Sequence, residues 1–174
     1  MRCGSEAILS LDDSSKRAVI VKNQYEITLR EILNDSLWNF ATGRIEISED
    51  AEVPLFGYIA RYQLPADCIR VIELENKVPY KVEGKYIQCD IQESIKIKYI
   101  KFIEDPSLFS ASFIKALCLK LAEDISFVLV QSSTLQQAIS ADADRYLRKA
   151  RSYNAQEGVP ESRYPEDFVL GARV

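Results

Sequence analysis

The sequence contains no histidine, and it has only one methionine, one tryptophan and six glycines among its 174 residues. Without an imidazole, a Ser-His-Asp triad, a Cys-His nucleophile pair and histidine metal ligands are all excluded. The glycines are scattered, and neither the GxGxxG nor the GxxxxGK[ST] phosphate-binding pattern occurs. We therefore expect no cofactor, no metal site and no nucleotide chemistry.

Cysteines are also few, and the four present stand far apart with no CxxC motif: Cys3, Cys68, Cys89 and Cys118. This spacing favours reduced, mostly buried thiols over a disulfide framework or a zinc site. No apolar run approaches the roughly 20 residues of a membrane span, and residues 1–11 lack the apolar core of a signal peptide. We expect a chain that is made in a cytoplasm and has no membrane partner.

The charge balance is mildly acidic, with 22 Lys+Arg, 26 Asp+Glu and a formal net charge of -4. Broad binding of nucleic acid requires clustered basic residues, so this balance argues against it. Hydrophobic residues make up 47% of the chain and charged residues 28%, which are ordinary values for a globular protein. The length is that of one domain that can fold without disulfides or metals.

Hydrophobic periodicity predicts three helices. The first follows the candidate caps at residues 12–15 and ends near residues 34–36. Its apolar positions recur at steps of three and four residues: Ala18, Val21, Tyr25, Leu29 and Ile32. The second helix follows residues 104–107, and its apolar stripe is formed by Phe113, Leu117, Leu121, Ile125 and Val128. A third is predicted from residues 132–134 to a stop at residues 158–160.

Between the first two helices, short runs with β-type composition alternate with turn residues. The candidate strands are residues 44–47, 58–63, 68–74, 80–82, 85–89 and 95–102. In the last of them, Ile95, Ile97 and Tyr99 alternate with lysines, so one face of the predicted sheet is expected to be solvated. The short connections favour antiparallel hairpins.

Together these patterns predict an α+β fold in which a helical bundle body of long amphipathic helices carries an inserted antiparallel β-sheet lobe and an extended C-terminal arm. The predicted body comprises residues 1–41 and 104–157, the lobe residues 42–103 and the arm residues 158–174. The arm mixes charges with aromatic and aliphatic residues and fits no period, so it is either a segment that orders on a partner or a frayed terminus.

Several residue groups have both a structural and a functional interpretation. The aromatic group at the passage from helix to sheet is expected to pack between the two lobes, with interface anchors as the alternative. It consists of Trp38, Phe40, Phe56, Tyr58 and Tyr62. Lys96, Lys98 and Lys101 are expected to protect a strand edge, with contact to a nucleic-acid backbone as the alternative.

Paired carboxylates are the remaining candidates for catalysis, because a glycosidase needs two of them across a cleft. The pairs are Asp12 with Asp13, Glu49 with Asp50, Glu73 with Glu75, Glu123 with Asp124, and Asp142 with Asp144. Helix capping, acidic loops and solvated faces account for such pairs better than catalysis does, because a catalytic pair needs a cleft that the sequence does not show. The residues alone therefore predict a non-enzymatic interaction protein.

Six sequence blocks in register resemble the tail tubular protein A family, the head-to-tail adaptors of short-tailed bacteriophages. They are residues 10–13 (SLDD), 38–41 (WNFA) followed by Arg44, 56–58 (FGY) with 62–71 (YQLPADCIRV), 80–84 (YKVEG), 105–109 (DPSLF), and 113–117 (FIKAL) with 121–122 (LA). The resemblance extends from about Ser10 to Glu157.

The resemblance implies a structural role without catalytic residues. Copies of the chain would form a ring, twelve in the usual assembly, beneath the portal protein in the virion, and adaptors of this kind can stay monomeric until a portal templates the ring. The ring would support a tail nozzle protein resembling tail tubular protein B, and DNA would pass through the channel without specific binding.

By the same resemblance, the last helix and the arm would contact the portal, and the exposed loops of the sheet would face the nozzle. The portal-contacting residues implied in this way are Arg145, Arg148, Lys149, Tyr153, Tyr164, Phe168 and Leu170. Family members usually begin with a further helix, and by the resemblance we expect this helix to be absent or shortened here. Part of the apolar stripe on residues 110–130 is therefore expected to be exposed or covered by a neighbouring subunit.

Two functions of other classes stay open. Some adaptors of short-tailed phages degrade peptidoglycan, so a phage-associated hydrolase that uses a carboxylate pair is one alternative. A protein that contacts DNA through Lys96, Lys98 and Lys101 is the other, and it would bind DNA with a steep dependence on salt.

Overall fold

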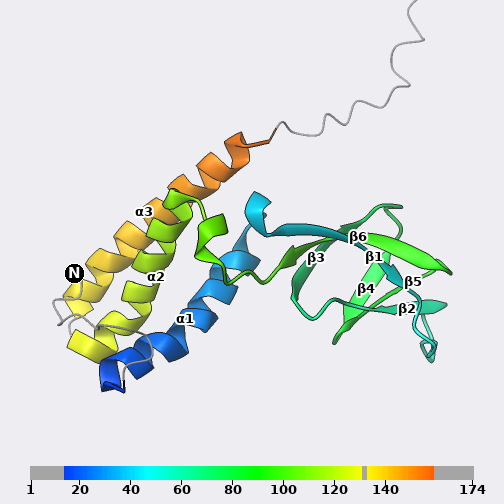
Figure 1. The fold of residues 1–174 in the computed structure, drawn as a ribbon, viewed down its shortest axis with the longest axis horizontal. Helices are drawn as coiled ribbons and strands as arrows, with labels where there is room; N and C mark the ends of the chain where they lie inside the picture. The colour runs from blue at the N-terminus through cyan, green and yellow to red at the C-terminus, as the bar shows by residue number, and fades with distance from the viewer. Residues whose placement is uncertain (1–13, 131–132, 159–174) are drawn as a thin grey trace, which may run out of the picture.

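The computed structural model describes residues 14–130 and 133–158, which form three α-helices and two three-stranded antiparallel sheets (Figure 1). The helices are α1 (Lys16–Asp35), α2 (Ala111–Val130) and α3 (Ser133–Gln156), with short 3-10 turns η1 (Asn39–Ala41) and η2 (Pro106–Leu108). The strands are β1 (Thr42–Ser48), β2 (Ala60–Gln63), β3 (Cys68–Leu74), β4 (Tyr80–Glu83), β5 (Tyr86–Cys89) and β6 (Ser94–Lys101).

The helix boundaries follow from caps that are visible in the sequence. The Ser15 side chain accepts a hydrogen bond from the Ala18 backbone N–H at 3.3 Å and so starts α1, as predicted. Asp105 caps η2 by accepting from the Ser107 N–H at 2.9 Å. Ser110 then accepts from the Phe113 N–H at 3.2 Å, one turn later than the sequence predicted for the start of α2.

All six predicted strands are present, with ends that differ by at most two residues. They pair differently from the predicted succession of hairpins. One sheet has the order β1-β6-β3 and the other the order β2-β5-β4, so β4 and β5 are the only consecutive strands among the described residues that pair with each other. Strand β6 therefore lies at the centre of the first sheet. Because β6 pairs with β1, the last strand of the inserted segment lies beside the first one.

The two sheets pack face to face around their own core. Ile95, Ile97 and Tyr99 of β6 point into this core, as the alternation predicted, and Tyr62 and Ile87 meet them from the second sheet. The result is a small sandwich, with Lys96 and Lys98 on its outer face.

A second core lies where the helices meet the sandwich. Helix α2 packs against both α1 and α3, as Figure 1 shows. The core between them is completed by Trp38 from the α1–β1 connection and by Ile100 and Ile103 from the end of β6. Five aromatic contacts join this cluster, among them the Trp38 and Phe113 rings, whose centroids are 4.9 Å apart in an edge-on arrangement.

The predicted fold class is therefore wrong. Residues 14–130 and 133–158 contain three helices and two three-stranded sheets, in place of a bundle of long helices with one inserted sheet. The physical reason is that the inserted strands form two sheets that pack on each other around a core of their own, while Trp38, Ile100 and Ile103 complete the core between the helices. The division of the chain into body, lobe and arm stays a prediction, and the arm lies outside the described residues except for Gly158.

The apolar stripe on α2 was expected to be partly exposed. Phe113, Leu117 and Ile125 are buried at 0%, 5% and 8% exposure, and Leu121 is half-buried. Ile114, at the margin of the stripe, is 40% exposed, so among the described side chains the centre of the stripe is covered by the chain itself and its margin is exposed. The Val128 side chain lies outside this described set.

Two further expectations fail at single residues. Cys89 is buried and Cys68 half-buried, as expected, but Cys118 is exposed on α2, and Cys3 lies outside the described residues. Trp38 and Tyr62 are fully buried as expected, whereas Phe56 is 87% exposed and does not pack between the two lobes. An aromatic residue of a turn-rich loop was assigned to the core because sequence alone does not show which side of a loop faces inward.

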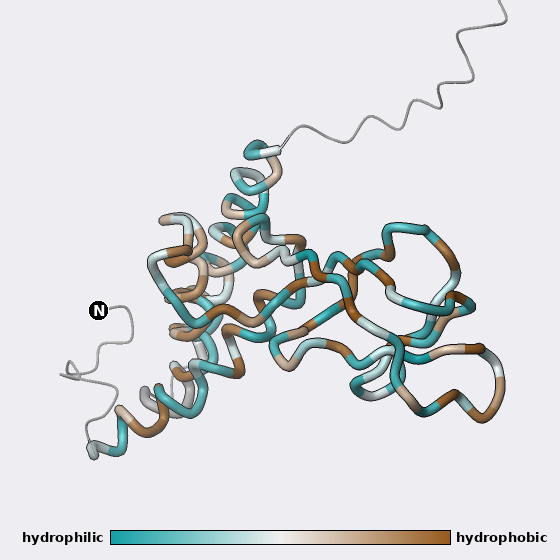
Figure 2. The backbone as a smooth tube through the Cα atoms, turned by 45° about the vertical axis from the view of Figure 1, so that its right-hand side comes forward, coloured by the Kyte–Doolittle hydropathy of each residue, from teal (hydrophilic) through white to brown (hydrophobic). Residues whose placement is uncertain are grey.

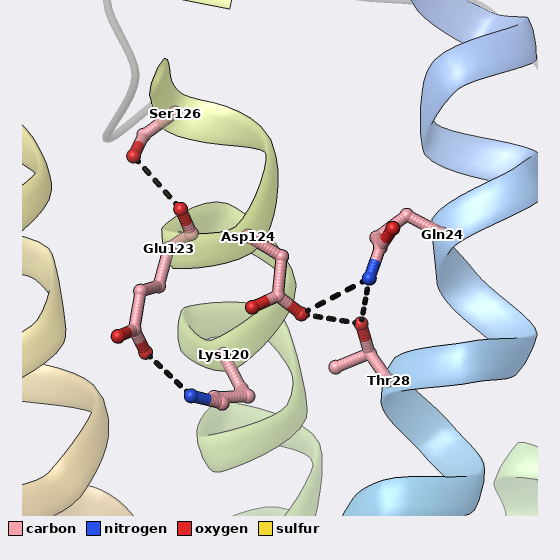
Figure 3. A network of polar contacts seen from close by, with 6 residues as sticks. All are labelled: Gln24, Thr28, Lys120, Glu123, Asp124 and Ser126. Atoms are coloured by element: carbon pink, nitrogen blue, oxygen red, sulfur yellow. Dashed lines mark hydrogen bonds and ion pairs between the residues drawn. The ribbon is translucent and has the colours of Figure 1, made fainter. Parts of the chain in front are cut away.

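A polar network connects α1 to α2 within the helical layer (Figure 3). The buried Thr28 hydroxyl donates to the Asp124 carboxylate at 2.6 Å, and the Gln24 amide lies 3.5 Å from the same oxygen. On the other side of α2, Lys120 and Glu123 form an ion pair at 3.0 Å. Because a half-buried carboxylate needs donors in a fixed place, this network sets the register of α1 on α2.

The substitution Thr28→Val is expected to lower the free energy of unfolding by about 1–3 kcal/mol, because it keeps the shape of the side chain but leaves Asp124 without its shortest hydrogen bond. Urea denaturation measures the change. The Thr28→Ser variant keeps the hydroxyl and serves as the control. A loss in Thr28→Ser without a loss in Thr28→Val would show that packing of the methyl group matters and the hydrogen bond does not.

Tyr62 provides a pH-dependent prediction. Burial raises the pKa of this tyrosine from its ordinary value of 10.0 to about 12, and its hydroxyl donates to the Ile91 carbonyl. The folded protein then holds the phenolic proton more tightly than the unfolded chain does. The contribution of Tyr62 to the free energy of unfolding is fully present below pH 10 and is lost as the pH rises through 12.

We therefore expect the unfolding free energy to fall between pH 10 and pH 12, and to fall less steeply in the Tyr62→Phe variant. Burial also raises the pKa of Tyr99 and Tyr25, so part of the fall remains in the variant. Denaturant titrations at several pH values measure the two slopes. Identical slopes in wild type and variant would contradict the assignment to Tyr62.

Candidate interaction surface

The outward face of α3 collects the predicted portal-contacting residues that the structure describes. Arg145, Arg148, Lys149 and Tyr153 are all exposed, with Tyr153 at 47%. Ile139, Ala143 and Ala150 face the other way and are buried at 3% or less. The helical spacing of the sequence thus separates one buried face from one exposed, mostly basic face.

Cations and aromatic rings on this face lie close to one another. The Arg145 guanidinium is 5.3 Å from the centre of the Tyr146 ring, and the Lys115 ammonium of α2 is 6.0 Å from the same ring. The Lys149 ammonium lies 5.5 Å from the Tyr153 ring. We refer to this surface as the cation–aromatic patch, formed by Lys115, Arg145, Tyr146, Arg148, Lys149 and Tyr153.

Four of the six patch residues carry a positive charge, on a chain whose net charge is -4. Asp142 balances part of that charge through an ion pair with Arg145 at 2.7 Å. Rings that hold cations at a surface combine apolar contact area with charge, and such residues are enriched at protein interfaces. The chemistry of the patch therefore fits a protein surface that presents carboxylates.

One member of the patch was missed by sequence reasoning. Tyr146 lies within the stretch from Arg145 to Tyr153 that the resemblance assigned to the portal. Lys115 lies 31 positions before Tyr146, on the other helix, and no local pattern points to it. Three predicted residues, Tyr164, Phe168 and Leu170, lie outside the described residues.

The end of α3 is fastened to the connection between α1 and β1. The Asn154 side chain accepts from the Asn39 N–H at 2.8 Å and donates to the Leu37 carbonyl at 2.7 Å. The Asn39 side chain donates in turn to the Asn154 carbonyl at 2.7 Å, and Arg151 forms an ion pair with Asp35. We call these contacts the α3 clamp, because they hold the helix that carries the patch at the point where the sandwich begins.

The lysines considered for DNA contact are used differently. Lys98 of β6 pairs with Glu73 of the neighbouring strand β3 at 3.3 Å, and Lys96 pairs at 3.2 Å with Glu75, which directly follows β3. Lys101 lies at the end of β6, beyond this ladder of charges. The structure does not gather the three lysines into one uncompensated basic surface.

Most candidate carboxylate pairs include a member with a structural partner. Asp50 and Glu52 share the Arg61 guanidinium. The Asp50 carboxylate also accepts from the Glu52 backbone N–H at 2.9 Å, and this hydrogen bond together with Arg61 lowers the pKa of Asp50. Glu73 and Glu75 pair with lysines, Asp124 binds Thr28, and Asp142 pairs with Arg145. The pair at residues 12–13 lies outside the described residues.

No protein-family model matches the chain, and no curated protein matches it. Within residues 14–130 and 133–158, no helix combines the length and the apolar character needed to cross a membrane.

Proposed function

We propose that this chain is a subunit of a head-to-tail adaptor ring in a short-tailed bacteriophage, a structural protein that docks beneath the portal and carries the tail nozzle. The observation that carries the proposal is the exposed cation–aromatic patch. It assembles the described members of the predicted portal-contacting set on one face of α3. The six sequence blocks that resemble tail tubular protein A support the same role.

The arrangement of the chain suits a connector. The patch on α3 would bind an acidic surface of the portal, and the α3 clamp fixes that helix to the root of the sandwich. A load applied at the tail would then pass through the sandwich to α3 by hydrogen bonds and an ion pair. The sandwich would face the nozzle, as the resemblance implies.

The charge of the chain is compatible with a channel through which DNA slides. A net charge of -4 repels phosphate, and Lys96 and Lys98 are neutralised by glutamates of the same sheet. DNA contact would then be transient and without sequence preference. The virion would contain the chain at its head-to-tail junction.

The proposal is tested by mixing the purified chain with the portal protein encoded in the same genome and following the complex by sedimentation velocity. We expect the chain to co-sediment with the portal oligomer. Its free sedimentation rate in the presence of excess portal would contradict the proposal. Clearing of purified cell walls, or DNA binding that weakens steeply with salt, would favour the hydrolase or the DNA-contacting alternative.

Removal of residues 159–174 is expected to abolish portal binding while leaving the unfolding transition unchanged, because the contacts described in residues 14–130 and 133–158 are kept in the shortened chain. Binding to the portal and urea denaturation measure the two effects. Unchanged affinity for the portal would remove the arm from the proposed interface.

A further inference from the structure

Strand β1 lies at one end of the first sheet, whose strand order is β1-β6-β3. On one side it pairs with β6, and within residues 14–130 and 133–158 no strand pairs with its other side. The chain pairs with β2 only after β1 has ended, at the bridge between Glu49 and Tyr62. Unpaired strand edges carry backbone N–H and C=O groups that can bind another chain. We call residues 43–47 the β1 edge.

The hydrogen bonds of β6 show which backbone groups of β1 face the open side. The Lys96 carbonyl accepts from the Glu75 N–H at 3.0 Å on the β3 side, so the even-numbered residues of β6 bond β3 and the odd-numbered residues bond β1. Ile45 is opposite one of the odd-numbered residues and is therefore bonded to β6. Its neighbours Arg44 and Glu46 direct their N–H and C=O groups to the open side.

The side chains of the β1 edge also indicate a missing neighbour. Hydrophilic and hydrophobic residues alternate along the strands of the sandwich, as Figure 2 shows. Ile45 lies opposite Ile97 and shares its face, which is the inner face of the sandwich. Ile97 is 2% exposed, whereas Ile45 is 39% exposed because no strand lies beyond it. A strand added at this edge would cover Ile45.

The charges on the outer face of the β1 edge are only partly satisfied. Arg44 is opposite Lys98, a like charge that binds Glu73 at 3.3 Å, and no carboxylate of the described residues forms an ion pair with Arg44. Like charges directly opposite each other destabilise a strand pair. Glu46 lies two residues further on the same face, and its partner among the described residues is the Ser94 hydroxyl. One cation and one anion thus stand two residues apart without counter-ions.

We propose that the β1 edge of one chain pairs antiparallel with the β1 edge of a second copy of this chain, in the register that sets Ile45 opposite its own counterpart. Each Arg44 then lies opposite the Glu46 of the other copy, and this opposite-charge pair occurs twice about the two-fold axis. The two inner faces become continuous, so the two Ile45 side chains cover each other.

The sequence of the β1 edge selects this register. A shift of two residues in one direction sets Arg44 against Arg44, and a shift in the other direction sets Glu46 against Glu46. A shift of one residue brings the inward-facing Ile45 opposite an outward-facing charge. Opposite charges two residues apart are therefore complementary to an antiparallel copy of themselves, unlike a run of lysines, which protects a strand edge by repulsion.

The contact is independent of the proposed adaptor function. The same patch serves both chains, so the contact closes with two copies and is not the lateral contact of a ring. It covers the open edge of the free chain. About five residues a side is well below the 20–30 of a standard interface, so we expect a dissociation constant no tighter than about 1 μM.

An exchange of charges tests the pairing, measured by sedimentation equilibrium of the full chain at concentrations up to about 1 mM. Arg44→Glu places four glutamates at the contact of two copies, and Glu46→Arg places four arginines there. Each variant alone should self-associate at least tenfold more weakly than the wild type. An equimolar mixture of the two restores both opposite-charge pairs, as does the Arg44→Glu/Glu46→Arg variant, and each should associate within about threefold of the wild type.

The matched control mixes Lys85→Glu with Glu31→Arg, at exposed positions outside β1. These variants have the same net charges as the test pair, -6 and -2, so an effect of overall charge would appear equally in them. They should associate like the wild type. A wild type that stays monomeric, or a loss in Arg44→Glu that neither the mixture nor the double variant reverses, would overturn the inference.

Disulfide formation tests the register itself. Ile45 occupies a non-hydrogen-bonded position, where opposite Cα atoms are about 4.5 Å apart and within reach of a disulfide. In a Cys3→Ser/Cys118→Ser background, Ile45→Cys should form a crosslinked dimer in a glutathione buffer. Glu46→Cys should not, because its two copies lie diagonally, about 7–8 Å apart. Crosslinking of Glu46→Cys in preference to Ile45→Cys, or of neither, would contradict the proposed register.

Discussion

Replacing Trp38 with alanine is expected to lower the free energy of unfolding by about 3–5 kcal/mol, the range for removing a large aromatic side chain from a core. Trp38 is fully buried, and its indole N–H donates to the Ile32 carbonyl at 2.7 Å. Its ring packs edge-on against Phe113 and lies 6.0 Å from Phe40. The substitution therefore opens a cavity and removes the donor from a buried carbonyl in one step.

The neighbouring residue provides the control for this prediction. Leu37→Ala removes an apolar side chain that is 53% exposed, and surface changes of this kind stay within about 0.5 kcal/mol. Urea denaturation followed by far-ultraviolet circular dichroism measures both variants. A loss below about 1 kcal/mol in Trp38→Ala would contradict the assignment of this residue to the centre of the helical core.

The second large effect is expected at the cation–aromatic patch. The Arg145→Glu/Lys149→Glu variant should bind the portal at least a hundredfold more weakly, which corresponds to about 2.8 kcal/mol at 1.4 kcal/mol per factor of ten. It removes the cations from Tyr146 and Tyr153 and places carboxylates against the acidic surface that we propose as the partner. Binding by the wild type should also weaken as salt is added.

The matched control reverses two exposed lysines of the sandwich, Lys77→Glu/Lys85→Glu. Both double variants change the net charge of the chain from -4 to -8, so a loss caused by overall charge alone would appear equally in each. Sedimentation binding curves against the portal measure the affinities. Equal weakening in the two variants would mean that the patch is not the docking surface.

The secondary structure could be predicted from the sequence because its signals are local. Ser15 and Asp105 cap their helices as their residue types indicate, and the alternation of isoleucine and lysine in β6 separates the buried from the solvated face. The arrangement of strands could not be predicted in the same way. Strand β6 pairs with β1 and β3, and no local pattern shows that the other three strands form a second sheet.

For the candidate surfaces, too, local sequence patterns predict the faces of single helices but not the contacts between elements. The basic residues of α3 lie on one face because of helical periodicity, which the sequence displays. Lys115 joins them only through the packing of α2 on α3, and Asn154 reaches Leu37 across 117 positions. Phe56 was predicted to pack between the two lobes, but the core of the sandwich does not include it and its side chain is exposed.

Electron microscopy of portal oligomers incubated with the purified chain is the most direct test of the central claim. The account predicts added density that forms a ring at the narrow end of the portal. In that ring, α3 would lie against the portal and the β sandwich would point away from it. Portals that stay bare at saturating concentrations of folded chain would contradict the adaptor function.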